Sequence, residues 1–156
     1  MTEAGKPQGA NRRRVLTVGA LGGLAAAVLP GMAFAKPEDV AAEIKKLYGE
    51  KKPAEGKVKL DMPQIAENGN VVPLTVTVDS PMTDDDYVKT VHVFAEGNPL
   101  PFIAAFYLTP ACGKAQVSTR IRMAATQNVV AVAETGKGEL YTGKVEVKVT
   151  IGGCGG

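Results

Sequence analysis

Apolar and polar residues alternate strictly over residues 144–151. The segment reads Lys144-Val145-Glu146-Val147-Lys148-Val149-Thr150-Ile151. Successive side chains of a β-strand point to opposite faces, so a period of two buries one face of a strand and leaves the other in water. The same alternation recurs at 73–79 and 117–123. These segments restrict the chain to folds built mainly from β-strands.

Further strand-like segments are separated by turn residues. They are 58–60, 87–94, 102–108 and 127–133, with glycine, asparagine or proline in most of the intervening stretches. About seven strands at spacings near ten residues are typical of an immunoglobulin-like β-sandwich. We therefore predict an all-β sandwich over 57–151, with a small barrel as the structural alternative.

Residues 36–49 are expected to form a short N-terminal helix. Val40, Ile44 and Leu47 fall on one face at helical spacing. Acidic residues precede this stripe and lysines follow it, as the helix dipole favours. Gly49 ends the segment, and the polar stretch 50–57 reads as a loop.

Composition excludes several classes of function. The chain has 156 residues, of which 45% are hydrophobic and 22% charged, as in a soluble globular protein. The first 35 residues hold four basic residues and one acidic residue, which leaves 14 basic and 15 acidic residues for 36–156. This balance does not suggest a nucleic-acid partner. One histidine and two cysteines are too few for most metal sites, so we expect neither a metal nor a cofactor.

Residues 1–35 resemble a twin-arginine export signal. Arg12, Arg13 and Arg14 precede a mildly apolar stretch, 15–29, which is shorter than the roughly 20 residues that span a bilayer. Small residues end the segment at Ala35, so we expect cleavage before Lys36 and a periplasmic protein without a membrane anchor. An ordinary secretory signal and a membrane anchor are the alternatives.

The most specific feature is the terminus, 152–156, where four glycines flank one cysteine. The sequence is Gly152-Gly153-Cys154-Gly155-Gly156. Glycine gives maximal backbone freedom and a slim profile, so we expect a flexible arm that carries the Cys154 thiol into the active sites of other proteins. Nothing in the tail activates the sulfur, which indicates a carrier with no catalytic residues of its own.

Other readings of the terminus remain open. Cys154 could form a structural disulfide with Cys112. In the entropy model, closing the loop between them would stabilise the fold by about 4 kcal/mol. The tail thiol could instead cross-link an exported binding or assembly module to a partner. A ubiquitin-like tail, which uses its terminal carboxyl group, fits poorly because an exported protein meets no ATP.

The terminal motif, after a valine-rich strand, resembles the SoxY family of sulfur carriers. The central segments 110–124 and 126–133 resemble that family too, and the twin-arginine leader fits it. The resemblance implies that Cys154 is the attachment point for sulfur intermediates of thiosulfate oxidation. It assigns Cys112 no role, which leaves this residue as a buried small hydrophobe, a cross-link to another chain, or the intrachain partner of Cys154.

The resemblance also implies a set of protein partners. SoxZ, a second sandwich protein without a signal, would form a heterodimer with this chain and be exported with it. The cytochrome SoxXA would attach thiosulfate to Cys154, the hydrolase SoxB would release sulfate, and the sulfane dehydrogenase SoxCD would oxidise the remaining sulfur.

Three other groups are weaker candidates. His92 could bind copper with Met82 or Met123, which would make the protein a copper chaperone. Arg120 and Arg122 could attract an anion or a partner's carboxylates, although a solvated strand face is the simpler reading. The adjacent carboxylates of 84–86 lack the alternating ligand spacing of a calcium loop and read as a solvated turn.

Overall fold

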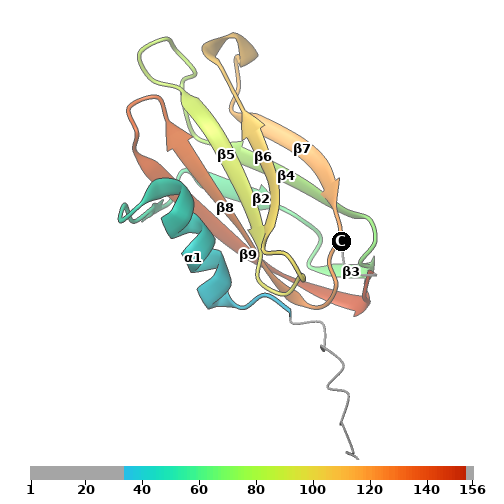
Figure 1. Ribbon diagram of the computed structural model, residues 1–156. Helices are drawn as coiled ribbons and strands as arrows, with labels where there is room; N and C mark the ends of the chain where they lie inside the picture. Colours follow the sequence, from blue (N-terminus) through green and yellow to red (C-terminus); the bar gives the residue numbers. More distant parts are fainter. Residues whose placement is uncertain (1–33, 154–156) are drawn as a thin grey trace, which may run out of the picture. The chain divides into compact units, whose positions relative to one another are not determined.

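The computed structural model describes residues 34–153 and shows a β-sandwich with one α-helix (Figure 1). The elements in chain order are α1 (Pro37–Tyr48), β1 (Ala54–Glu55), β2 (Val58–Asp61), β3 (Ile65–Asn68), β4 (Val72–Val78), β5 (Val88–Ala95), β6 (Phe102–Tyr107), the 3-10 turn η1 (Pro110–Cys112), β7 (Gln116–Ile121), β8 (Gln127–Thr135) and β9 (Leu140–Ile151). The predicted all-β sandwich with a short N-terminal helix is confirmed. No helix within 34–153 is long and apolar enough to cross a membrane.

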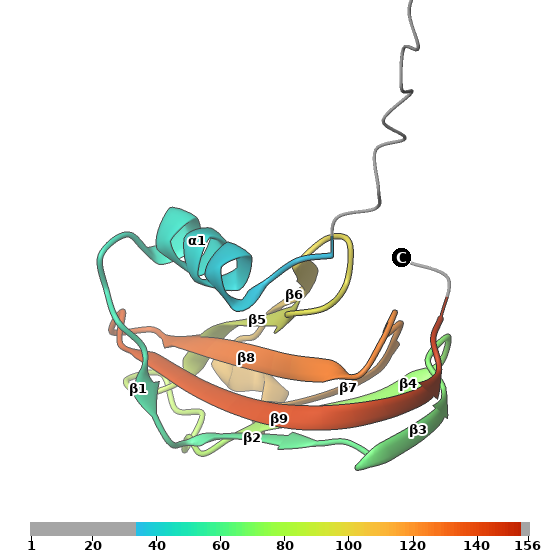
Figure 2. The ribbon, with the colours of Figure 1, turned by 90° about the horizontal axis from the view of Figure 1, so that it is seen from below.

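The strands form two layers (Figure 2). The larger sheet has the order β1-β9-β8-β5-β6, with β3 also paired to β9, and the smaller has the order β2-β4-β7. In the larger sheet, neighbouring strands run antiparallel, except that β1 and β3 run parallel to β9. Helix α1 lies over the outer face of the larger sheet (Figure 2).

The core lies between the two sheets and follows the alternation of the sequence. Val72, Leu74 and Val76 of β4 are almost fully buried against Val129 and Val147 of the facing sheet. Burying an aliphatic side chain of this size stabilises the fold by roughly 1.5–3 kcal/mol relative to exposure. The inward-facing residues of the alternating strand β4 therefore contribute substantially to the free energy that holds the sandwich together.

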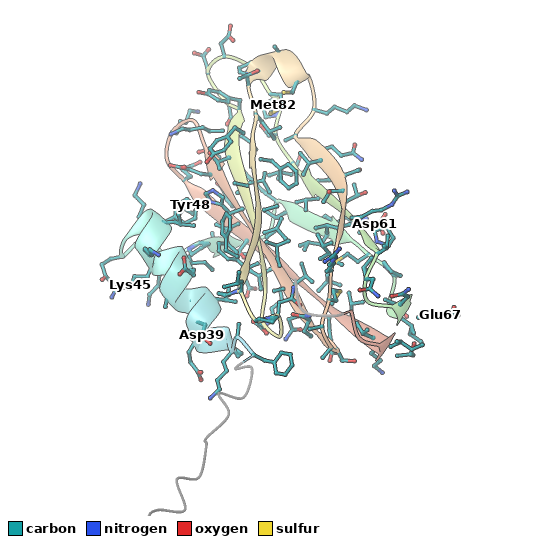
Figure 3. The ribbon with its side chains drawn as sticks, turned by 45° about the vertical axis from the view of Figure 1, so that its right-hand side comes forward. Asp39, Lys45, Tyr48, Asp61, Glu67 and Met82 are labelled. Atoms are coloured by element: carbon teal, nitrogen blue, oxygen red, sulfur yellow. The ribbon has the colours of Figure 1, made fainter. Side chains whose placement is uncertain are left out.

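Strand β5 is buried on both faces because helix α1 covers its outer side. Val40 of the helix, together with Ile44 and Tyr48, packs on Phe94 and the β8 residues beside it. The expected helical stripe is partly wrong, since Leu47 is 44% exposed and Tyr48 takes its place against the sheet. Tyr48 lies at the end of α1 farther from Asp39 (Figure 3).

Two short strands depart from the sequence prediction. β1 lies in the stretch expected to be a loop, and the 65–68 segment forms β3. Neither strand shows an alternation of apolar and polar residues. Both are held in place by backbone pairing with β9, in which Ala54 lies opposite Tyr141 and Ile65 opposite Lys148.

Candidate functional site: the base of the carboxyl-terminal tail

The proposed carrier tail is described as far as Gly153. Cys154, Gly155 and Gly156 lie outside the described residues, as do residues 1–33 of the proposed export signal. Strand β9 ends at Ile151, so Gly152 and Gly153 are the part of the tail whose contacts can be followed.

Gly153 is buried and hydrogen-bonded between two loops. Its amide donates to the carbonyl oxygen of Met123 over 2.9 Å, and the Met123 amide donates to the carbonyl oxygen of Gly69 over 2.7 Å. The Gly69 amide in turn donates to the carbonyl oxygen of Ile151 over 2.8 Å. We call Gly69, Met123, Gly152 and Gly153 the tail clasp. It connects the tail to the β3–β4 turn and to the loop after β7.

Glycine is required in the clasp because the backbones approach closely. A Cβ atom on Gly152 would lie 2.1 Å from the carbonyl oxygen of Ala124, and one on Gly69 would lie 2.2 Å from that of Met123. A Cβ atom on Gly153 would lie 2.9 Å from the carbonyl oxygen of Gly69. The expectation that the tail glycines serve only freedom of movement therefore does not hold for Gly152 and Gly153, whose missing side chains allow close packing.

A buried side chain supports the clasp from behind. Asn98, which is 3% exposed, donates to the carbonyl oxygen of Arg122 over 2.8 Å. Its Oδ1 atom accepts from the Ala124 amide over 2.9 Å and from Gln127 Nε2 over 2.8 Å. These bonds fix the loop that carries Met123. In the sequence, this asparagine is only one of the turn residues that separate the strand-like segments.

The two arginines border separate hollows. Arg122, next in sequence to Met123, lines a cavity of about 180 Å³ with Asn98, Leu100, Phe102 and Ile103. Arg120 lines a wider hollow of about 600 Å³ over the outer face of β4 and β7. The structure thus places Arg122 beside the clasp and Arg120 on the face of the smaller sheet.

Cys112 lies at the opposite end of the sandwich from the clasp. It ends η1, just before β7, and the β4–β7 ladder runs from the pair Thr77 and Gln116 at that end to Val72 and Ile121 near the clasp. Five residue steps along a strand span roughly 17 Å. Because the Cα atoms of a disulfide lie at most about 7 Å apart, Cys112 is out of reach of the described end of the tail at Gly153, which argues against the intrachain disulfide.

Cys112 is also not the buried small hydrophobe that the sequence left open as one alternative. Its side chain is exposed and its thiol is free. The Thr109 hydroxyl group lies 4.0 Å from its sulfur. Of the alternatives left open by the sequence, a cross-link to another chain is compatible with this exposed position.

His92 takes part in packing rather than in a copper site. Its Nδ1 atom and the Tyr48 hydroxyl group are hydrogen-bonded over 2.5 Å, and its ring contacts those of Phe94 and Phe102. Met82 and Met123 instead belong to the core between the sheets. Burial lowers the pKa of His92, against a smaller opposite effect of Glu134. The three residues of the copper hypothesis are therefore not brought together.

The acidic turn 84–86 carries no sign of a calcium site. Its residues are exposed or half-buried, and the Asp86 amide donates to the Thr83 hydroxyl group over 3.2 Å, as in an ordinary polar turn. Among residues 34–153, no three histidine, cysteine or acidic side chains gather as metal ligands would.

Fold and tail together define a small β-sandwich protein whose last strand runs into a glycine tail that is packed against two loops. Residues 44–154 match the family model described as "Sulfur oxidation protein SoxY". The chain is 36% identical to the sulfur carrier protein SoxY from Chlorobium limicola f thiosulfatophilum, over 73% of this chain and 98% of that one, with a TM-score of 0.62. The chain belongs to the SoxY family.

Another solved structure shares the fold alone. A superoxide reductase (neelaredoxin) from Ignicoccus hospitalis is 16% identical over 74% of this chain and 94% of that one, with a TM-score of 0.53. No curated protein matches the chain. The family assignment makes this chain a carrier protein of sulfur oxidation.

Proposed function

We propose that the protein carries sulfur intermediates of thiosulfate oxidation on the thiol of Cys154, in the periplasm. The observation that carries the proposal is the clasp, which binds the chain at Gly153, one residue before the cysteine. Consecutive Cα atoms lie about 3.8 Å apart, so the clasp at Gly153 limits how far the Cys154 thiol can reach. The family's specific terminal motif supports the same role.

The chemistry of the cycle is that implied by the family. Thiosulfate joins Cys154 through a new bond between its outer sulfur and Sγ, while the thiol proton leaves and two electrons pass to the SoxXA cytochrome. In the active site of SoxB, water then attacks the terminal sulfonate sulfur of the group on Cys154. This step releases sulfate and leaves a persulfide on the cysteine. The dehydrogenase SoxCD then removes electrons from the outer sulfur, which takes its oxygens from water and becomes a sulfonate. A further hydrolysis releases this sulfonate as sulfate and regenerates the thiol.

We further propose that the protein has no catalytic group of its own. Within the described part of the chain, the residues of the clasp and its support are glycines, Met123, Asn98 and Gln127, none of which titrates near neutral pH. Activation of the thiol therefore falls to the visiting enzymes. A SoxZ-like chain is proposed as the stable partner, exported with this one.

Intact-mass spectrometry tests the proposal. The mature protein is incubated with thiosulfate and the partner enzymes, and adducts are mapped by peptide analysis. We expect added masses on Cys154, and none in a Cys154→Ser variant. Cys112→Ser is the matched control and should carry the same adducts as the unchanged protein. Adducts on Cys112, or turnover that survives Cys154→Ser, would contradict the proposal.

The exposed thiol of Cys112 favours a second role for this cysteine, a cross-link to another chain. Such a bond would hold a partner at the end of the sandwich away from the clasp. Non-reducing electrophoresis of the protein as isolated, compared with Cys112→Ser, tests this role. A mixed species that persists in Cys112→Ser would assign the cross-link to Cys154 instead.

A further inference from the structure

The residues on either side of the expected leader cleavage site are hydrogen-bonded into the folded domain. Ala35 is buried, and its amide donates to the carbonyl oxygen of Asn98 over 2.8 Å. The Lys36 amide, which belongs to the peptide bond between Ala35 and Lys36, donates to the Asp39 carboxylate over 2.7 Å. The Lys36 carbonyl oxygen in turn accepts from the Asp39 amide over 2.9 Å. The bond that a peptidase would cut therefore lies within the first turn of α1.

A groove holds the end of the leader against the domain. The segment before α1 runs past the loop between β5 and β6 (Figure 2), and Asp39 lies at the start of the helix (Figure 3). The groove has a volume of about 320 Å³ and is lined by Phe34, Ala35, Asp39, Ala42, Glu43, Pro99 and Pro101. Its loop wall is itself fixed, because the Ala95 amide donates to the carbonyl oxygen of Pro101 over 2.8 Å. We call residues 34–36, with their partners Asn98 and Asp39, the leader contact.

The leader contact conflicts with what a peptidase needs. An enzyme that removes an export signal recognises small side chains in an A-x-A-like pattern, here Ala33-Phe34-Ala35. To reach such an enzyme, Ala35 must leave its buried position, and the amides of Ala35 and Lys36 must give up their partners. Proteolysis of a folded protein proceeds through local opening of this kind. Its rate follows the population of the open form when opening and closing are fast relative to cleavage.

We propose that the folded domain protects its own leader cleavage site, so that removal of the leader waits for residues 34–36 to detach. The inference rests on the proposed twin-arginine export, because a protein exported in the folded state meets the peptidase with the leader contact already formed. The cleavage itself is a hydrolysis. Water adds across the peptide bond between Ala35 and Lys36, the new carboxylate leaves with the leader, and the new amino group begins the mature chain.

Processing of the full-length precursor by a purified signal peptidase in detergent tests the inference. The comparison is Leu74→Asp, which places a carboxylate in the core and should unfold the same full-length chain, as circular dichroism would show. Mass spectrometry follows the product. We expect the folded precursor to be cut at least about tenfold more slowly than the unfolded chain, with Lys36 as the first residue of both products.

Two substitutions loosen the leader contact without changing the small side chains that the enzyme recognises. Phe34→Ser removes an apolar side chain from the groove, at the position where the recognition pattern accepts any residue. Asp39→Ala removes the partner of the Lys36 amide. Each should speed cleavage of the folded precursor several times, and neither should change the rate in the Leu74→Asp background.

Glu38→Ala is the matched control. It removes an exposed carboxylate from the same first turn of α1 but takes no partner from the leader contact, so the cleavage rate should not change. Equal rates for the folded and the unfolded chain, or equal rates for Asp39→Ala and Glu38→Ala, would overturn the inference and leave the proposed export and carrier role intact. A first residue other than Lys36 in both products would overturn the proposed cleavage site, and this inference with it.

Discussion

The amide of Gly153 donates a hydrogen bond to the carbonyl oxygen of Met123 over 2.9 Å, and this bond sets where the tail leaves the sandwich. The two glycines before Cys154 are thereby part of the folded domain rather than of a free arm. In the proposed carrier role, the clasp leaves the thiol of Cys154 less reach than five extended residues would give. An enzyme acting on it would have to approach the sandwich near Arg122 and the cavity at Asn98.

Adding a side-chain atom where the backbones of the clasp lie closest together should release the tail. In Gly69→Ala the new Cβ atom would lie 2.2 Å from the Met123 carbonyl oxygen and 2.6 Å from the Gly153 nitrogen, so the backbones must separate. We expect a loss of about 1–3 kcal/mol in the free energy of unfolding. Alkylation of Cys154 by a bulky maleimide, measured in a Cys112→Ser background, should become several times faster while thiosulfate-dependent turnover falls.

Asn70→Ala is the control for this prediction. It changes the same turn, where the Asn70 side chain is exposed, but adds no atom to the clasp. Its alkylation rate should match that of the unchanged tail. Equal rates in Gly69→Ala and Asn70→Ala would show that the clasp does not limit access to the thiol.

Removing the Asn98 side chain should destabilise the loop that carries Met123. Asn98→Ala deletes three hydrogen bonds and leaves the carbonyl oxygen of Arg122 and the amide of Ala124 without their partner. Because each buried polar group left unsatisfied costs about 1–3 kcal/mol, urea unfolding should show a loss of at least about 2 kcal/mol. Asn128→Ala, which loses one half-exposed bond to Glu96, should cost much less. Equal losses in the two variants would refute the supporting role of Asn98.

The sequence predicts the sandwich well because its main strands carry their own pattern. The alternation over 144–151 places Val147 in the core, and β4 follows the same rule. β1 and β3 escape prediction because they are ordered by the neighbouring strand rather than by their own side chains. Helix α1 was expected to bury Leu47, yet Tyr48 is the residue that reaches His92, since helical periodicity locates a stripe only to within one residue.

The site is predicted only in part, for a physical reason. The cysteine between glycines is visible in the sequence, but a glycine used for movement and a glycine used for close packing look the same there. The approach of Gly152 to Ala124 depends on two loops that are distant in sequence. Asn98 and Gly69 carried no signal beyond that of turn residues, and Cys112 could not be assigned to the surface from composition.

Export by the twin-arginine route should depend on the arginines rather than on their charge. Replacing Arg12, Arg13 and Arg14 by lysine keeps the net charge of the leader, yet we expect the protein to remain in the cytoplasm. Cell fractionation measures this outcome, and mass spectrometry of the periplasmic product should give Lys36 as the first residue. Unchanged export of the lysine variant would indicate a general secretory signal instead.

Cleavage before Lys36 should leave the start of helix α1 intact. The Lys36 amide nitrogen donates to the Asp39 carboxylate over 2.7 Å, and after cleavage the same nitrogen becomes the terminal ammonium group. A positive charge at a helix N-terminus is unfavourable, but Asp39 pairs with it. We therefore expect Asp39→Asn to destabilise the mature protein more than the precursor, as measured by thermal unfolding of both forms. Equal decreases in the unfolding temperatures of the mature protein and the precursor would contradict this prediction.

The buried His92, which is hydrogen-bonded to Tyr48, should make the stability of the protein fall in mild acid. Burial lowers the pKa of His92 in the folded protein below its usual value of 6.5. The unfolded chain therefore binds a proton more readily, so this contribution to stability is full above about pH 6.5 and is lost as the pH falls from there toward the folded pKa. Thermal unfolding at pH 7.5 and pH 5.5 should show this loss, and His92→Gln should reduce it. Tyr48→Phe keeps the histidine and should retain the pH dependence, while a pH dependence unchanged in His92→Gln would assign it to other groups.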